Sequence, residues 1–509
     1  MAESKDAITA SLEINSRLSK AIDKAVEKNS ILRIGWTSSG TPTPKDGEMG
    51  LCPGLPKGAR VRALGRLGDF ISTASKGGAF TIQGDAGDFL GAGNNGGEIV
   101  CEGQAGDWTG WSMRDGKITI LGGVGDDTGA QMHSGLIVIR GHAGKRIGGG
   151  MRGGCIVIHG DVGSDPGAGM RGGMVIINGR CPQPAPGVSL RTLTALELKD
   201  INSQISDDSL EIPSDAVCLC ADDVQPTNSE PCKEIRDLAT IGIVPATKIR
   251  SPSHATIDTV VLLGDKGGEA MGLPLPLIPI LNTVKAKGLR IDRQPCIVRK
   301  SPRRIDFVII DADNIHETPV ILDKCQGFLL DLSSFPPMDA ENIDGLIVAM
   351  RGLCAPDSTL MMIDGLNSCE SVHSSAAHHN ADMVAVRMND GTGTPGPASL
   401  PIIGRSTMTY LESKEIVSGV ELPWEATSSD LAILCASGVK AVISPAPKEI
   451  EEWLMNLETG LCDNLRRIGI ASIDELERKH LRALDHETAS TSGLRLSGYE
   501  RPLPHWFAR

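Results

Sequence analysis

The sequence is poor in aromatic residues and in positive charge. Only 3% of its 509 residues are Phe, Trp or Tyr, and 63 Asp and Glu outnumber 50 Lys and Arg, which gives a formal net charge of −13. Because binding to nucleic acid needs clustered Lys and Arg, this balance argues against a nucleic-acid partner. The sequence also lacks an apolar run of about 20 residues and a basic N-terminal segment followed by an apolar one. We therefore predict a cytoplasmic protein without a membrane partner.

Paired cysteine motifs with the spacing of a zinc site are missing as well. The 13 cysteines are scattered, and the nearest approach to a metal motif is Cys218-x-Cys220 followed by Cys232. This spacing differs from that of a paired zinc knuckle, so we predict reduced, buried or half-buried thiols here and no metal site. The length exceeds that of one ordinary core, which favours two or three domains.

Glycine, in contrast, is abundant, and it recurs at a fixed step of nineteen residues between positions 78 and 179. Four positions of the repeat keep this step. The first set is Gly78, Gly97, Gly116, Gly135, Gly154 and Gly173; the second is Gly84, Gly103, Gly122, Gly141, Gly160 and Gly179; the third is Gly87, Gly106, Gly125, Gly144 and Gly163; the fourth is Gly91, Gly110, Gly129, Gly148 and Gly167. Met113, Met132, Met151 and Met170 follow the same step.

Short runs with alternating apolar residues lie between the glycines, for example "AFTIQ", "KITIL" and "CIVIH". A fixed period near twenty with a strand in each repeat is typical of a solenoid, so we predict stacked coils with parallel strands. The glycines would supply positive-φ corners and close backbone approaches, with Gly141 a candidate for such a corner. We expect the amphipathic segment from Leu12 to Val26 to cap the first coil, and the prolines after Gly179 to end the repeat.

The coils resemble the GXGXG domain over about residues 10–190. This domain is a right-handed parallel β-helix that occurs in glutamate synthase large subunits and in one of the subunits of formylmethanofuran dehydrogenases. The resemblance implies the same β-helix fold here. In both families this domain serves mainly as a scaffold, so it implies little about activity.

The second half has a different pattern. Nearly continuous apolar runs such as "DFVIID", "GFLLDL" and "DMVAVRM" alternate with helix-like segments, which is typical of a parallel sheet built from βα units. Several such units in series predict a TIM-type barrel or a doubly wound sheet. We therefore predict four parts: an N-terminal helix and lead-in (1–70), the β-helix (71–190), a linker (191–235) and an α/β domain, possibly incomplete as a barrel (236–509).

The segment "NADMVAVRMNDGTGTPGPAS" contains the candidate ligand site. An apolar strand ends near Met388 and leads into Asp390, Gly391, Thr392, Gly393 and Thr394. Loops at the carboxyl ends of parallel strands commonly bind ligands, and the amides and hydroxyls of this one could hold an anion. The alternative, a structural turn, stays open.

This segment resembles the loop of the FMN- and substrate-binding barrel of glutamate synthase. The resemblance implies an FMN-dependent oxidoreductase of nitrogen metabolism that aminates a 2-oxo acid reductively, with FMN bound at Asp390–Thr394. A partner glutaminase would supply ammonia, because the chain does not begin with a Cys nucleophile; an electron-donor subunit or a homo-oligomer is also implied. No catalytic residue is assigned.

The chain departs from this family at several positions. The glycine pair before the last phosphate-binding helix is replaced by "ELPWEATSSD", and only Cys462 falls where the family has three cluster cysteines. One thiolate cannot hold an iron–sulphur cluster, so none is expected. These departures favour the alternative function: a non-catalytic scaffold subunit of a complex, like the GXGXG-containing subunit of formylmethanofuran dehydrogenase.

Overall fold

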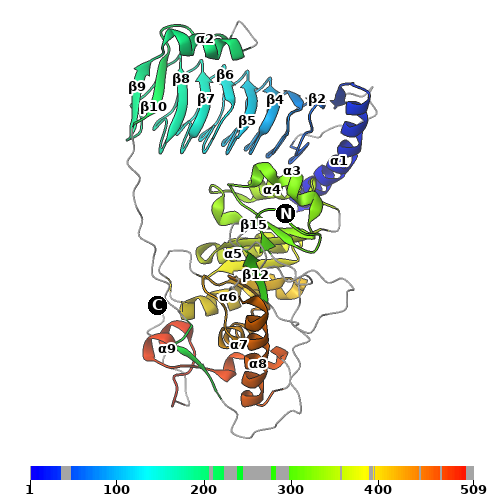
Figure 1. The fold of residues 1–509 in the computed structure, drawn as a ribbon, viewed down its shortest axis with the longest axis vertical. Helices are drawn as coiled ribbons and strands as arrows, with labels where there is room; N and C mark the ends of the chain where they lie inside the picture. Colours follow the sequence, from blue (N-terminus) through cyan, green and yellow to red (C-terminus); the bar gives the residue numbers. More distant parts are fainter. Residues whose placement is uncertain are drawn as a thin grey trace. The chain divides into compact units, whose positions relative to one another are not determined.

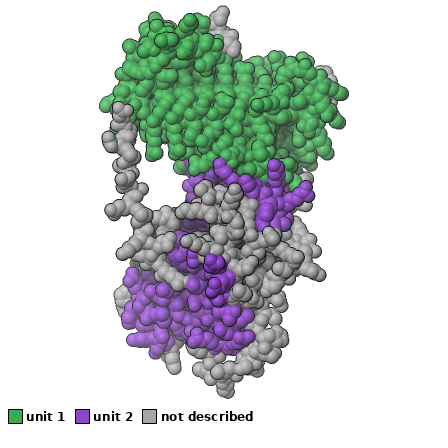
Figure 2. All heavy atoms as spheres, viewed as in Figure 1, with its two compact units in different colours: residues 1–229, 312–323, 337–356 green, residues 230–311, 324–336, 357–509 purple. Residues whose placement is uncertain are grey.

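The computed structural model describes residues 2–35, 47–205, 210–222, 238–244, 277–281, 297–355, 358–388, 394, 396–445, 449–470 and 473–499. The chain divides into two compact units, which Figure 2 colours differently. Unit 1 comprises residues 1–229, 312–323 and 337–356, and unit 2 comprises residues 230–311, 324–336 and 357–509.

Unit 1 is organised around a ten-stranded sheet with the order β1-β2-β3-β4-β5-β6-β7-β8-β10-β9 (Figure 1). Strands β1 to β8 pair in parallel, and β10 pairs antiparallel with both β8 and β9. The strands are β1 (Leu32–Ile34), β2 (Arg60–Leu64), β3 (Ala79–Gln83), β4 (Asn95–Cys101), β5 (Asp115–Ile120), β6 (Leu136–Ile139), β7 (Arg152–Ile158), β8 (Gly172–Ile177), β9 (Val188–Thr192) and β10 (Val217–Ala221).

Neighbouring parallel strands pair at a nineteen-residue offset, as between Ile118, Ile137 and Ile156. Isolated parallel bridges keep the same offset outside the strands, at Ala105, Val124, Ala143 and Val162. The turns also stack, since the amide of Gly129 donates to the carbonyl of Thr109 (2.8 Å) and the amide of Gly148 to that of Thr128 (2.9 Å). The predicted parallel, in-register pairing at nineteen-residue steps is therefore confirmed.

The repeated glycines serve two different purposes. Gly129 has a φ of +69°, a left-handed conformation that L side chains rarely adopt. Gly141 has no positive φ, so its assignment as a positive-φ corner is wrong. A Cβ at Gly141 would instead lie 2.5 Å from the carbonyl oxygen of Gly122 in the preceding coil. The close stacking of coil on coil, and not the backbone conformation, requires glycine at this position.

A row of aspartates stabilises the stacked turns. The carboxylate of Asp69 accepts from the amide of Asp88 (2.8 Å), Asp88 from Asp107 (2.8 Å), Asp107 from Asp126 (2.7 Å), and Asp126 from Lys145 (2.7 Å). Each carboxylate thus satisfies a backbone N–H of the next coil that the strands do not pair, as buried donors require.

The apolar residues of unit 1 form two clusters. The first includes one face of the parallel strands and the methionines at the nineteen-residue step, Met113, Met132, Met151 and Met170. Leu18 and Ile22 of α1 (Ala2–Glu27) belong to the same cluster, and α1 contacts β1 and β2, which precede the first predicted coil. The second cluster lies on the sheet face that α2 (Ala195–Gln204) covers, with Ile201 packed against Val157 and Ile176 (Figure 1).

The sheet continues beyond the last predicted coil. β9, α2 and β10 lie in the segment around residues 191–235 that the sequence suggests as a linker. The prolines after Gly179 do end the parallel pairing, but the chain returns and adds two antiparallel strands. Apolar residues such as Leu219 and Cys218 make this continuation favourable because both are fully buried.

Unit 1 also contains two helices that come from the second half of the sequence, α3 (Thr318–Ile321) and α4 (Ala340–Arg351). Asn342 on α4 donates to the carboxylates of Asp69 (2.9 Å) and Asp88 (3.1 Å). Gly345 follows on the same helix, with Phe70 3.3 Å from where its Cβ would lie. The small residue lets α4 approach the turns of the coils closely.

Unit 2 is built on eight parallel strands that close into a barrel in the order β12-β13-β14-β15-β16-β17-β18-β19. The strands are β12 (Leu277–Leu281), β13 (Ile297–Val298), β14 (Phe307–Ile310), β15 (Gly327–Asp331), β16 (Thr359–Gly365), β17 (Met383–Arg387), β18 (Val417–Glu421) and β19 (Ala441–Pro445). The predicted parallel sheet of βα units is confirmed.

Helices and a small sheet complete unit 2. The helices are α5 (Cys369–His379), α6 (Gly396–Tyr410), α7 (Ser428–Ala436), α8 (Ile450–Ile468) and α9 (His486–Ser492), and β11 (Ile241–Ile243) pairs antiparallel with β20 (Leu481–Ala483). None of the helices in the described residues is long and apolar enough to cross a membrane.

Candidate functional site

The barrel of unit 2 changes from apolar to charged at the carboxyl ends of its strands. Along β14, Phe307 and Ile309 belong to the cluster inside the barrel, and along β17, Met383 and Ala385 do. Side chains alternate along a strand, so the next inward positions are two residues further on. Asp311 occupies that position after β14, and Arg387 occupies it at the end of β17.

The inward position that follows the last apolar or glycine position is charged after or at the end of five strands. We call these five residues the mouth layer: Arg299, Asp311, Asp331, Arg387 and Glu421. Each lies two residues beyond an inward position that is apolar or glycine, at the end of the barrel where parallel-barrel enzymes bind their ligands. The layer contains three carboxylates and two guanidinium groups. Charges of both signs at one end of a barrel are suited to a small molecule that carries both charges or several polar groups.

Arg387 is the centre of this layer. Its Nε donates to Glu421 at 2.5 Å, and its two terminal nitrogens donate to the two carboxylate oxygens of Asp331 at 3.2 and 3.1 Å. A further contact joins Arg387 to the hydroxyl of Ser333, which itself donates to Asp331 at 2.7 Å. The fork of Arg387 is thus fixed in orientation, because a bidentate pair restricts both distance and angle.

Gly365 allows Arg387 to reach Asp331. The two residues lie on β17 and β15, which are separated by β16. On β16, Gly365 is the register partner of Arg387 and has no side chain at the level of the mouth layer. A side chain there would stand between the guanidinium and the carboxylate. The ion pair therefore depends on a glycine in the strand between them.

Burial perturbs one carboxyl group of the mouth layer and one beside it. The side chain of Asp331 is 8% exposed and that of Arg387 is 24% exposed. Burial raises the pKa of Glu421, and the charges of Arg387 and Arg299 oppose this rise. Burial also raises the pKa of Asp364, the next residue before Gly365, and the charge of Asp331 adds to the increase. Partly buried carboxyls with raised pKa values are suited to proton transfer at neutral pH.

A second ion pair joins Arg299, after β13, to Asp311, after β14. The Asp311 side chain is 5% exposed, while that of Arg299 is 45% exposed. Arg299 is therefore the more accessible of the two cations in the mouth layer. It is the described cation best placed to meet the carboxylate or phosphate of an entering ligand.

The N-terminus of α7 follows β18 and would be the usual place for a phosphate in such a barrel. Here a capping box already uses it: Asp430 accepts from the amide (2.9 Å) and hydroxyl (2.7 Å) of Thr427, whose hydroxyl accepts from the amide of Asp430 (3.3 Å). The Asp430 carboxylate also opposes an anion at this helix end. The described residues of α7 thus do not form a phosphate cradle.

The loop predicted from the sequence lies largely outside the described residues. This applies to Asp390, Gly391, Thr392 and Gly393, while Thr394 is described and half-buried. In the sequence, Asp390 follows Arg387 by three positions. Arg387 is the last residue of β17 and the centre of the mouth layer.

Sequence reasoning missed the mouth layer itself. A signal was present, since in "DFVIIDAD", "GFLLDLSS" and "DMVAVRMN" a charged residue follows an inward apolar residue by two positions. Cys462, which falls where the resembled family has its cluster cysteines, is half-buried, and so is Cys435.

Comparison with known proteins gives a family match for part of the chain. The family described as GXGXG motif matches residues 54–206. None of the curated proteins matches the sequence. Among solved structures, an (S)-mandelate dehydrogenase mutant is 14% identical over 48% of this chain and 88% of that chain, with a TM-score of 0.33.

Two further solved structures are similar over other shares of the chain. A flavocytochrome b2 variant with sulfite bound is 12% identical over 52% of this chain and 79% of its own, with a TM-score of 0.37. The formyltransferase/hydrolase complex (FhcABCD) of Methylorubrum extorquens with methylofuran is 24% identical over 28% of this chain and 65% of the matched chain, with a TM-score of 0.23.

Proposed function

We propose that the chain is a glutamate-synthase-type oxidoreductase of nitrogen metabolism whose barrel mouth binds a 2-oxo acid and its amino acid product. The mouth layer carries this proposal. An amino acid presents a carboxylate and an ammonium group, and the layer presents the exposed guanidinium of Arg299 beside the carboxylates of Asp311 and Glu421. Charge complementarity of this kind orients a small ligand at the end of a barrel.

The first unit supports the same proposal. The GXGXG family matches residues 54–206, and the strands within this range stack at the nineteen-residue offset that the family's coils imply. We infer that the coils form a right-handed parallel β-helix of the GXGXG type. In this proposal the coils are the scaffold of a cytoplasmic protein. The partners are a glutaminase that supplies ammonia and an electron-donor subunit, or further copies of the chain.

FMN fits the described residues only in part. When bound, FMN would supply the hydride for the reduction of an imine. Arg299 offers one cation, but at the start of α7 the amides of Thr427 and Asp430 are used within the capping box, and the Asp430 carboxylate opposes an anion there. We therefore assign the phosphate to the loop Asp390, Gly391, Thr392, Gly393 and Thr394. The glycines of this loop permit close approach, and its threonines offer hydroxyl donors.

The proposal is tested with the purified full-length chain and two ligands. FMN is added to the protein, excess flavin is removed, and the visible spectrum is recorded; 2-oxoglutarate is then titrated by calorimetry. We expect retained flavin bands and saturable binding of the 2-oxo acid, both weakened in Arg299→Met. Arg405 on α6 is exposed and lies outside the mouth layer, so Arg405→Met is the matched control. A colourless protein that binds neither ligand would overturn the proposal.

A scaffold subunit is the second candidate function, and a specific observation favours it. The donors of Arg387 are directed at Asp331, Ser333 and Glu421, so this guanidinium organises the barrel itself. A barrel whose central arginine is already bound by its own carboxylates can serve a structural role without binding a ligand. Failure to bind FMN and 2-oxoglutarate, together with co-purification of defined subunits, would favour this function.

A further inference from the structure

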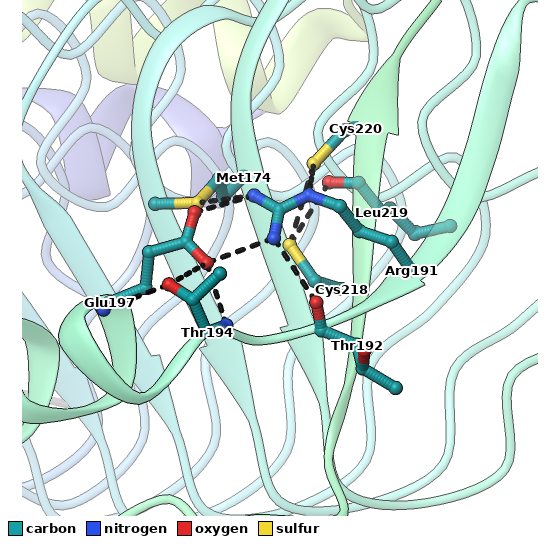
Figure 3. A network of polar contacts seen from close by, with 8 residues as sticks. All are labelled: Met174, Arg191, Thr192, Thr194, Glu197, Cys218, Leu219 and Cys220. Atoms are coloured by element: carbon teal, nitrogen blue, oxygen red, sulfur yellow. Dashed lines mark hydrogen bonds and ion pairs between the residues drawn. The ribbon is translucent and has the colours of Figure 1, made fainter.

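Two cysteines face each other on the last strand added to the sheet of unit 1. Cys218 and Cys220 are two residues apart on β10, so their side chains project from the same face. Their Sγ atoms are 3.6 Å apart, as Figure 3 shows. Cys218 is fully buried in the cluster beneath α2, whereas Cys220 is half-buried at its edge.

Arg191 holds its guanidinium against the more accessible thiol. It lies on β9 as the register partner of Cys218, and its Nε donates to the Sγ of Cys220 at 3.2 Å. Glu197 fixes the other side of the guanidinium with contacts of 2.6 and 2.9 Å, and itself accepts from the amide (2.9 Å) and hydroxyl (2.8 Å) of Thr194 (Figure 3). A positioned cation of this kind stabilises a thiolate over a thiol.

The two sulphurs are in different electrostatic surroundings. Burial is the main cause that raises the pKa of Cys218, and the neighbouring Cys220 adds to it. Burial thus favours the thiol form of Cys218, although the charge of Arg191 opposes it there, while the half-buried Cys220 accepts directly from the guanidinium. This difference is what an attacking and a resolving cysteine require.

The strand geometry permits a bond between them but makes it a strained one. Residues i and i+2 of an extended strand lie about 6.6–6.8 Å apart at Cα, at the upper end of the range usual for disulfides. Strained disulfides are more easily reduced than structural ones. A disulfide here would form and break reversibly.

We propose that Cys218 and Cys220 are a redox-active dithiol that a hydroperoxide oxidises to an intrastrand disulfide. The Cys220 thiolate attacks one peroxide oxygen, the O–O bond breaks, and the leaving alkoxide or hydroxide takes a proton. The resulting sulphenic acid reacts with the Cys218 thiol, so the S–S bond forms as water leaves. In total, two thiols and one hydroperoxide give one disulfide, one alcohol or water, and one water.

The other reading of this sulphur cluster is a site for a soft metal ion. Cys155 and Met174 are register partners on β7 and β8 and pack at the same cluster. However, the terminal nitrogen of Arg191 lies 3.6 Å from the Met174 sulphur, and its Nε lies on Cys220. A cation would have to displace this guanidinium, which opposes metal binding and favours a thiolate.

The experiment uses the full chain, hydrogen peroxide, and digestion at Asp residues. Cleavage before Asp215 and Asp222 releases residues 215–221, which contain Cys218 and Cys220 and no other cysteine. After peroxide treatment and alkylation, we expect this peptide to be unalkylated and lighter by two hydrogen atoms than the dithiol form, and a thiol reductant to reverse the change. A peptide that remains fully alkylated, or that carries only sulphinic acid, would overturn the proposal.

Variants separate the two roles and control for folding. In Cys218→Ala, dimedone should trap a sulphenic acid at Cys220, whereas Cys220→Ala should leave Cys218 unoxidised. Arg191→Met should slow alkylation of Cys220, because the guanidinium that lies beside its sulphur is lost. Cys101 is the internal control, because burial raises its pKa to about 11 and its alkylation should not change. Equal alkylation rates of Cys220 in wild type and Arg191→Met would count against the role of Arg191.

Discussion

Arg387 and Glu421 are register partners on adjacent barrel strands, and the Nε of Arg387 lies 2.5 Å from the Glu421 carboxylate. This pair joins two neighbouring strands. The pair between Arg387 and Asp331 instead joins β17 and β15, and it spans β16 at the level of Gly365. The orientation of the central cation thus depends on a contact across an intervening strand as well as on the pairing of adjacent strands.

Replacement of Arg387 should destabilise unit 2 markedly. In Arg387→Met the buried carboxylate of Asp331 loses its cation, and breaking a buried pair by removing one partner costs roughly 3 kcal/mol. Urea denaturation followed by tryptophan fluorescence measures the change. The double variant Arg387→Met/Asp331→Asn should recover part of the loss, because Asp331 is then neutral and only Glu421 still lacks its cation. A single variant as stable as Arg405→Met would show that the pair contributes little.

The stability of unit 1 should depend on pH through Asp69. Burial raises the pKa of Asp69 to about 6 from an ordinary value of 3.8, although the Asp88 amide and Asn342 donate to it. The folded state therefore binds this proton more tightly than the unfolded state. The stabilisation that results is complete below the unfolded pKa and is lost as the pH rises through about 6.

We expect Asp69→Asn to remove this component of the pH dependence. Between pH 5 and pH 7.5, the unfolding free energy of wild type should fall by roughly 1.4 kcal/mol more than that of the variant. Denaturation curves at both pH values measure the difference. Parallel pH profiles for the two proteins would mean that Asp69 titrates near its ordinary value.

The repeat could be predicted from the sequence because each coil makes the same contacts as the last. Gly129 and its equivalents keep one step, and so do the methionines. The aspartate row Asp69, Asp88, Asp107 and Asp126 follows that step too, and could have been found in the same way. The repeat does not show why glycine is needed at each position. A positive φ and a close approach between chain segments both require glycine, so the two causes look the same in the sequence.

The mouth layer is harder to predict because some of its partners meet across an intervening strand of the sheet. Asp331 and Arg387 are 56 residues apart, and their contact needs Gly365 on a third strand. Strand patterns predict each inward position separately. They do not specify which inward charges meet across an intervening strand.

Gly141 provides a test of coil stacking that does not involve backbone conformation. In Gly141→Ala the new Cβ would lie 2.5 Å from the Gly122 carbonyl oxygen, so the coils must separate locally. We expect a loss of roughly 1–3 kcal/mol, as for other overpacked sites. Gly404 on α6 is the matched control, since a Cβ there is 3.4 Å from its nearest neighbour and the helix favours Ala. Equal stabilities of the two variants would contradict the close-approach explanation.

The loop after β17 should carry the affinity for an anionic ligand if the proposed function holds. It begins three residues beyond Arg387, follows an apolar strand, and contains Gly391 and Gly393, each followed by a threonine. Replacing both glycines by Val would add branched side chains where a phosphate or carboxylate must approach the backbone amides closely. We expect binding of FMN, or of 2-oxoglutarate, to be lost, while the circular dichroism and the unfolding of unit 1 stay unchanged. Gly404→Ala, outside the loop, should bind both ligands as wild type does. Unchanged affinities in the double variant would make the loop a structural turn and would leave Arg299 as the candidate for anion binding in the mouth layer.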